Sequence, residues 1–284
     1  MRKHSRAWRV GALGITVALA FLFTLPIANP HHSIKPAGFV PEGAAASLLL
    51  PQPQSPGEAL RVLYDRASQT YAKIDSYIHR MKRREVFNGV KNPEEVMLVK
   101  FRKEPFSVYI KWLGTQGKGR EIVYVKGKFD NKMHLSMAAG DIFKFSPAGM
   151  KFALQPDDPL AKSKSRHAIT ETGFGHIIER FGRIVAAIEK NDPREGKVEY
   201  LGKVKRPEFE QPVEAVHHVI PEKLEPLLPK GGQRWYHFDA TSGLPVLTIA
   251  HDATGEVEYY CNDHIQFPVR LDDEDFNPER LGKK

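Results

Sequence analysis

The chain has 284 residues, of which 41% are hydrophobic and 27% are charged, values that exclude a membrane bundle or a wholly disordered protein. Its formal net charge of +8 falls to +4 when the first 32 residues, with four cations and no acid, are set aside. That excess is too small to indicate a nucleic-acid partner. A single cysteine, Cys261, excludes an internal disulfide, so a hydrophobic core must hold the fold.

Residues 1–32 predict an export signal. Four cations among the first nine residues precede an uncharged, apolar run over residues 10–28, which is the order of a signal peptide. Two interpretations remain open. One is a cleaved signal peptide, and the other is an uncleaved anchor in the inner membrane, since about 18 apolar residues suffice to span a bilayer. Both place the rest of the chain on the extracytoplasmic side, in the periplasm.

Residues 33–57 predict a flexible linker, because five prolines fix φ and remove backbone donors. The segment Ser55-Pro56-Gly57-Glu58 then has the spacing of a capping box, with proline at the first helical position. Apolar residues follow at helical spacing as far as Ile74. A helix with one apolar face is therefore expected over residues 58–74.

From Tyr77 onward the hydrophobic period changes to two, which is typical of strands with one buried face. The predicted strands cover residues 77–87, 96–102, 107–112, 120–127 and 132–137. Their connections are short, whereas a parallel crossover needs a dozen or more residues. The first half of the chain is therefore predicted to be an antiparallel meander.

Residues 153–172, rich in Asp, Pro, Lys and Ser, predict a mobile loop, and helical spacing returns over residues 174–190. Further strands are expected over residues 197–205, 214–221, 234–239, 245–251 and 256–270. The tail, residues 271–284, opens with Asp272-Asp273-Glu274-Asp275. We expect this acidic run to be solvated and loosely ordered.

This order of elements predicts an α+β fold. Residues 77–137 and 197–270 should form one continuous antiparallel sheet, which is long enough to curl as its twist accumulates. The two helices should lie on the concave face, because each has an apolar stripe that the sheet can cover.

Three segments carry a family resemblance: Pro105 to Trp112, Gly119 to Val125, and Trp235 to Pro245. They resemble an exported bacterial family of unknown function, which in turn is similar to the LolA/LolB type of periplasmic lipoprotein carriers and receptors. The resemblance covers residues 58–270. It implies a LolA-like, half-open β-barrel closed by helices, with acyl chains held in the apolar space between them. No functional residue follows from it, because no motif aligns position by position.

The candidate ligand-binding residues are apolar alternates of two strands and two residues of the second helix. They are Met97, Val99, Phe101, Val108, Ile110, Trp112, Ile177 and Phe181. Two uses remain open for them, a packed core and the wall of a lipid cavity. A basic strip, Arg80, Lys82 and Arg84, shares one strand face. It is interpreted either as the solvated outer face of the sheet or as a patch for anionic head groups or an acidic partner.

No catalytic or metal motif is found in the sequence: HExxH, CxxC and GxSxG are all missing. His176 and Glu179 lie three residues apart on the second helix but have no identifiable further ligands. Cys261 has no activating neighbours in the sequence and is interpreted as an inert thiol. We therefore expect no catalytic residue, no metal and no cofactor.

The sequence favours a non-enzymatic, extracytoplasmic binding protein for an apolar ligand, an acyl chain or a lipidated protein. The alternative is an envelope protein-interaction or sensor module without a lipid cavity, and an unrecognised hydrolase is the third hypothesis. The expected partners are the apolar ligand, an envelope protein and, through residues 10–28, the inner membrane. Nucleic acid is not expected.

Overall fold

The computed structural model describes residues 55–87, 89–162 and 165–283. The predicted signal or anchor, residues 1–32, and the predicted linker up to residue 54 lie outside the described residues. The first described residue, Ser55, is the N-cap of helix α1 (Pro56–Ala72), and its hydroxyl accepts a hydrogen bond from the Glu58 backbone N at 3.2 Å. The helix start predicted from the proline and the capping spacing is therefore confirmed.

Two series of strands follow, one on each side of the second long helix. The first series and the short elements after it are β1 (Ser76–Phe87), β2 (Val90–Lys91), β3 (Glu95–Arg102), β4 (Ser107–Trp112), β5 (Glu121–Val125), η1 (Phe129–Asn131), β6 (Met133–Ser136), β7 (Lys151–Leu154), α2 (Pro159–Lys162) and η2 (Ile169–Glu171). The second comprises α3 (Phe174–Glu189), η3 (Pro193–Glu195), β8 (Lys197–Val204), β9 (Val213–Ile220), β10 (Gly232–Asp239), β11 (Pro245–Asp252), β12 (Gly255–Gln266), η4 (Asp273–Phe276) and η5 (Pro278–Arg280).

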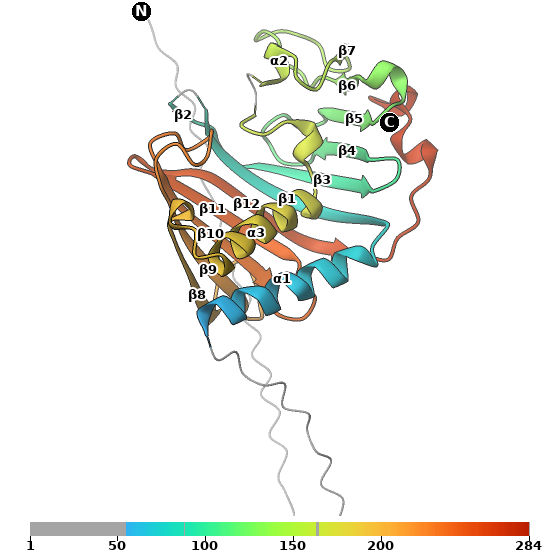
Figure 1. Ribbon diagram of the computed structural model, residues 1–284. Coiled ribbons are helices and arrows are strands. Elements are labelled where there is room, and N and C mark those ends of the chain that lie inside the picture. The colour runs from blue at the N-terminus through green and yellow to red at the C-terminus, as the bar shows by residue number, and fades with distance from the viewer. Residues whose placement is uncertain (1–54, 88, 163–164, 284) are drawn as a thin grey trace, which may run out of the picture. The chain divides into compact units, whose positions relative to one another are not determined.

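The described strands form one 12-stranded sheet in the order β7-β6-β5-β4-β3-β1-β12-β11-β10-β9-β8, with β2 paired to β1 (Figure 1). Each series is an antiparallel meander, and the long strands β1 and β12 join them with Arg80 opposite Asp263 and Arg84 opposite Tyr259. The predicted continuous sheet is therefore confirmed. It is curved and not closed, as expected for a half-open barrel.

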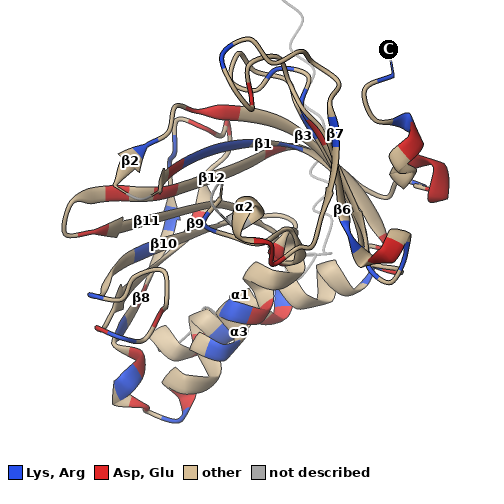
Figure 2. Ribbon diagram, turned by 90° about the horizontal axis from the view of Figure 1, so that it is seen from above, with Lys and Arg blue, Asp and Glu red and all other residues tan. Residues whose placement is uncertain are grey.

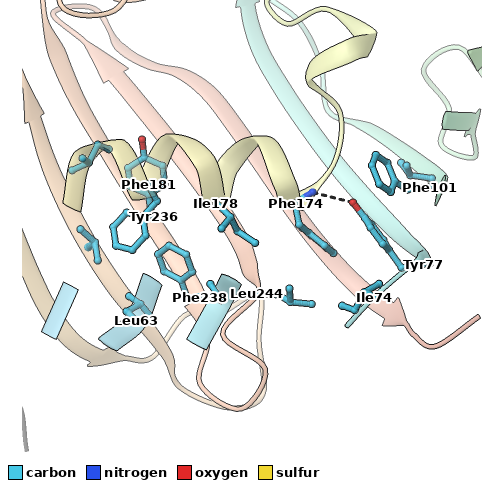
Figure 3. Packing of buried hydrophobic residues seen from close by; sticks show 14 of the residues in the cluster. Leu63, Ile74, Tyr77, Phe101, Phe174, Ile178, Phe181, Tyr236, Phe238 and Leu244 are labelled. Carbon is cyan, nitrogen blue, oxygen red and sulfur yellow. Dashed lines mark hydrogen bonds between the residues drawn. The ribbon is translucent and has the colours of Figure 1, made fainter. Parts of the chain in front are cut away.

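The two long helices lie on the inner side of the arc that the strands form when seen from above (Figure 2). Their apolar stripes meet the sheet in the main core, where Leu63 of α1 and Phe181 of α3 contact Phe238 and other buried residues (Figure 3). Fully burying one such side chain contributes roughly 1.5–3 kcal/mol. The predicted placement of the helices on the concave face is thus confirmed.

Helix α3 starts without a side-chain cap of its own. Its N-cap is Gly173, with φ of +107°, and a Cβ there would lie 2.7 Å from the Phe101 ring, so glycine is required. The free N–H of Phe174 donates instead to the buried hydroxyl of Tyr77 at 2.9 Å (Figure 3). The Tyr77 ring also stacks on Phe174 and Phe101, at centroid distances of 4.6 and 4.9 Å.

Residues 153–172, which we predicted as a mobile loop, contain short regular elements within their described part. This segment contains the end of β7, helix α2 and the turn η2. Arg166 fixes its second part to the sheet, because its guanidinium donates to Glu258 at 2.9 Å, to the Val86 carbonyl at 3.1 Å and to the Leu227 carbonyl at 2.6 Å. The first part of the segment is exposed at Asp157, as a polar composition predicts, whereas Ser165, Arg166 and His167 of the second part pair with the buried Glu85 and Glu258.

The expected loose tail after residue 270 is wrong. Asp272 and Asp275 form a capping box around η4, and Phe276 is completely buried. The acids of the turn bind cations on the outer face of the sheet, with Asp275 at 2.7 Å from Lys100 and Asp273 at 2.9 Å from Arg102. Charge complementarity with the sheet therefore orders a run that looked solvated by itself.

Candidate ligand-binding pocket

A pocket of about 420 Å³ opens on the concave face of the sheet, beside helix α3. Strands β1, β3–β7 and β10–β12 contribute to it, and α2, η2 and the first half of α3 cover it. The segment between β7 and α3 therefore forms part of the binding site. Pockets of this size are typical of small-molecule sites.

One side of the pocket, which we call the apolar wall, consists of hydrophobic side chains from β3–β7, α2, η2 and α3. They are Met97, Ile110, Trp112, Ile122, Met133, Leu135, Phe152, Leu154, Leu160, Ala161, Ile169 and Ile177. At the opening some of these side chains remain in contact with solvent, with Leu160 55% and Phe152 37% exposed. The apolar lining therefore reaches the molecular surface at these two residues.

The other side, which we call the polar end, is lined by charged and hydrogen-bonding side chains of β1, β10–β12, η2 and α3. They are His79, Arg83, His167, Glu171, His176, Arg180, Arg234, Tyr236, Thr248, Glu258, Tyr260 and Asn262. The pocket thus has an amphipathic lining, which matches a ligand with one apolar and one polar part.

Glu258 is the centre of the ion pairs at the polar end. It is completely buried and accepts hydrogen bonds from Arg234 at 2.5 Å and from Arg166 at 2.9 Å. Burial alone raises its pKa, but the adjacent Arg234 and His167 hold the pKa of Glu258 well below its ordinary value. The carboxylate therefore stays ionised, as a structural anion.

His167 lies between two carboxylates. Its Nδ1 is 2.7 Å from Glu171, and its Nε2 is 3.6 Å from Glu258. Burial lowers the pKa of this ring, but the hydrogen bonds to Glu171 and Glu258 outweigh that effect and raise the pKa to about 9. His79, by contrast, is buried and its pKa falls to about 4, chiefly through loss of solvation. Burial also lowers the pKa of His176, so the polar end holds a cationic His167 together with two histidines that favour the neutral form near pH 7.

The structure divides the eight predicted pocket residues into two groups. Met97, Ile110, Trp112 and Ile177 lie in the apolar wall. Val99, Phe101, Val108 and Phe181 are buried in the main core and do not line the pocket. The six strand residues form cross-strand pairs, Met97 with Trp112, Val99 with Ile110 and Phe101 with Val108, so one continuous stripe serves both as core and as wall.

The predicted basic strip on β1 is neutralised by acids. Arg80 makes two hydrogen bonds of 2.7 Å to Asp263 of β12, and Lys82 is 3.3 Å from the same carboxylate. Arg84 contacts Glu256 at 3.0 Å. The sequence could not show these partners, because they come from a strand some 180 residues away. The strip is therefore not a free cationic surface.

The described residues contain no group of three or more histidine, cysteine or acidic side chains that could hold a metal ion. His217 and His218 point to opposite sides of β9, His217 stacking on Trp235 at 4.8 Å and His218 contacting the Glu195 carbonyl at 2.7 Å. Burial raises the pKa of the Cys261 thiol to about 11, which removes the thiolate needed for nucleophilic chemistry at neutral pH.

Residues 74–281 match the family described as Protein of unknown function (DUF1571). The chain belongs to this family. The match spans both meanders, the pocket and the ordered C-terminal turns, so the DUF1571 region extends past residue 270, where the resemblance found in the sequence ended. The prediction of an uncharacterised family is confirmed. No curated protein matches the chain in sequence.

Several solved structures are similar to this DUF1571 chain at low identity. The lipoprotein LppX of Mycobacterium tuberculosis is 11% identical, with 75% of this chain and 98% of that chain covered and a TM-score of 0.45. A putative outer membrane lipoprotein-sorting protein domain from Vibrio parahaemolyticus is 12% identical, with 78% and 99% covered and a TM-score of 0.39.

A LolA superfamily protein from Nitrosomonas europaea is 10% identical, with 78% of this chain and 99% of that chain covered and a TM-score of 0.35. LolA-type proteins are thus among the solved structures that resemble this chain, as the sequence resemblance implied. Within residues 55–87, 89–162 and 165–283, no helix has the length and hydropathy to cross a bilayer.

Proposed function

We propose that this DUF1571 protein is a non-enzymatic, extracytoplasmic binding protein that takes up an apolar ligand, the acyl chain of a lipid or of a lipidated protein. The observation that carries the proposal is the pocket of about 420 Å³ with its apolar wall. Sites of this size bind ligands mainly through hydrophobic contact. The export pattern of the first 32 residues supports the location.

The composition of the lining also supports an acyl ligand. Four of the six methionines in the chain line the pocket, namely Met81, Met97, Met133 and Met137. Methionine is unbranched and polarizable, so it adapts to ligands of different shape. An acyl chain has many conformers, and a flexible lining can follow them without a rigid complementary surface.

Displacement of a fluorescent fatty-acyl probe tests the proposal. Each methylene buried in the pocket contributes about 0.8 kcal/mol, which corresponds to roughly fourfold tighter binding. Saturated chains of increasing length should therefore displace the probe with rising affinity until the pocket is full. A folded protein that takes up no probe at micromolar concentration would reject the proposal.

A matched pair of variants locates the uptake. Leu154→Trp adds volume to the apolar wall and should abolish or strongly weaken probe binding. Leu201→Trp makes the same change on β8, at a position that is exposed and outside the pocket, and should bind like the parent. A charge at Ile110 would likewise block uptake, whereas a charge at Phe181 would disrupt the core. Equal binding by both tryptophan variants would place the ligand elsewhere.

A protein-interaction module is the second candidate. Phe143 and Phe145, in the loop between β6 and β7, do not line the pocket, and they are 58% and 83% exposed. Exposed apolar patches, unlike single exposed side chains, mark protein–protein contact sites, and these two rings lie in the same loop. Native mass spectrometry separates the two candidates, because a co-purifying lipid mass supports the binding protein and a protein-only mass favours the interaction module.

A further inference from the structure

Ion pairs of three arginines lie directly behind the polar end. Glu258 binds Arg166 and Arg234, and Glu225 binds Arg234 at 2.8 Å and Arg180 at 3.4 Å. Three guanidinium groups thus share two carboxylates. The adjacent ion pair of His167 and Glu171 contributes one positive and one negative charge, so it does not change this excess of cations over anions. Arg83, which also lines this end, pairs with Glu95 at 2.5 Å and with Glu85 at 3.7 Å, so the charges of the whole polar end balance, and the cationic excess is local to Arg166, Arg180 and Arg234.

Two donors at the polar end also have spare hydrogen-bonding capacity. Among the described residues, Arg180 makes only the 3.4 Å ion pair with Glu225, although a guanidinium has five N–H groups. Tyr236 is 1% exposed, and its hydroxyl has no hydrogen-bond partner in the described part of the chain. Burial raises the pKa of Tyr236 to about 12, so the hydroxyl keeps its proton. A buried polar group of this kind requires a partner.

Both donors belong to the pocket lining and come from opposite layers. Arg180 lies on α3, one turn after His176 and Ile177, which also line the pocket, and Tyr236 lies on β10 of the sheet beneath. A group that enters the polar end can therefore contact the helix and the sheet together. The apolar wall lies on the other side, along β3–β7.

We infer that the polar end recognises an anionic oxygen group, a carboxylate or a phosphate, at the end of the ligand's apolar chain. This inference rests on the proposed function, because it names the chemical class of ligand that the pocket takes. Arg180 supplies the opposite charge, and the Tyr236 hydroxyl donates a hydrogen bond that no described residue accepts. Charge-assisted hydrogen bonds are the strongest that a neutral-pH site can offer such a group.

Four ligands with the same 16-carbon chain test the inference on the full-length protein. Hexadecanoate carries a carboxylate, hexadecyl phosphate a phosphate, hexadecanol a neutral hydroxyl and hexadecylamine a cation. Displacement of the fluorescent acyl probe measures the affinity of each. Binding of the anionic ligands should be about 10- to 100-fold tighter than that of hexadecanol. Comparison of hexadecanoate with hexadecyl phosphate shows whether the site prefers the carboxylate of a free fatty acid or the phosphate of a phosphorylated lipid.

Arg180→Gln should remove most of this preference, because it should weaken binding of the two anionic ligands far more than binding of hexadecanol. Arg183→Gln is the matched control, because Arg183 is exposed on the same helix and does not line the pocket. This variant should keep the preference for anionic ligands. Tyr236→Phe should weaken anion binding without lowering the melting temperature, since its hydroxyl has no described partner. Wild-type protein that binds acid, alcohol and amine equally, or amine best, overturns the inference while the proposed function stands. Absence of binding by all four chains would reject both.

Discussion

Tyr77→Phe isolates one buried hydrogen bond that positions helix α3 against the sheet. The variant keeps the ring that stacks on Phe174 and Phe101, and it removes only the hydroxyl that accepts the Phe174 N–H at 2.9 Å. Gly173, the N-cap, supplies no side chain that could replace it. A buried N–H would then remain unsatisfied, which costs about 1–3 kcal/mol of the free energy of unfolding.

Urea unfolding, followed by tryptophan fluorescence, measures the difference in the free energy of unfolding between variant and parent. The slope of the transition should not change, because both proteins expose the same surface area when they unfold. The melting temperature should fall by about 2–4 °C for each kcal/mol lost. Tyr200→Phe is the matched control. Its hydroxyl is 3.2 Å from Glu214, but that carboxylate keeps Arg66 at 2.8 Å, so the loss should stay below about 1 kcal/mol.

A Tyr77→Phe protein that unfolds within about 0.5 kcal/mol of the parent would refute the reasoning, since the Phe174 N–H would then have another partner. A loss as large as that of a core truncation, about 3–5 kcal/mol, would refute it in the opposite direction. It would mean that the ring stack had moved with the hydroxyl.

Further predictions concern stability. Trp112→Ala should lower the free energy of unfolding by about 3–5 kcal/mol in urea titration. Melting temperatures measured across pH 4–9 should peak near pH 6.5. The pKa of His79 is lowered to about 4, so its contribution to stability is lost as the pH falls below 6.5. The pKa of His167 is raised to about 9, so its contribution to stability is lost as the pH rises from 6.5 to 9. His167→Gln should flatten the alkaline side. Truncation after residue 271 removes the buried Phe276 and should lower the melting temperature by several degrees.

Much of the fold follows from local patterns in the sequence. The period-two segment ending in Trp112 gave its strand exactly, and the helices were placed to within two residues. The register that pairs β1 with β12 was not predictable, because the two strands are far apart in the chain. The order of the acidic turn at Asp272 was missed for the same reason, since its cationic partners lie on β3 and in the β5–β6 turn, although Asp272, Asp273 and Glu274 are exposed as expected.

The candidate site was predictable only where it continues the core. Alternation identified Ile110 and Trp112 as inward-facing, but it could not tell wall from core, because both have the same hydrophobic pattern. The polar end was missed altogether. Glu258 shares its strand face with Glu256 and Asn262, so the sequence pattern marks that face as solvated, and Arg180 lies within one turn of the exposed Arg183. Nothing in the sequence marks Glu258 as buried, since charged residues are almost never fully buried unless they are paired, and its partners Arg166 and Arg234 come from other elements.

The two sides of the pocket have complementary roles in keeping it open. An empty, closed apolar cavity of about 420 Å³ would cost on the order of 10 kcal/mol at the rate measured for core cavities, so a fold that relied on these side chains alone would collapse over it. Here the main core around Leu63, Phe181 and Phe238 lies beside the pocket and anchors both helices. The ion pairs of Glu258 hold the covering segment through Arg166. The pocket is thereby framed by elements that are fixed elsewhere, and the surface of the apolar wall that faces it remains available for a ligand.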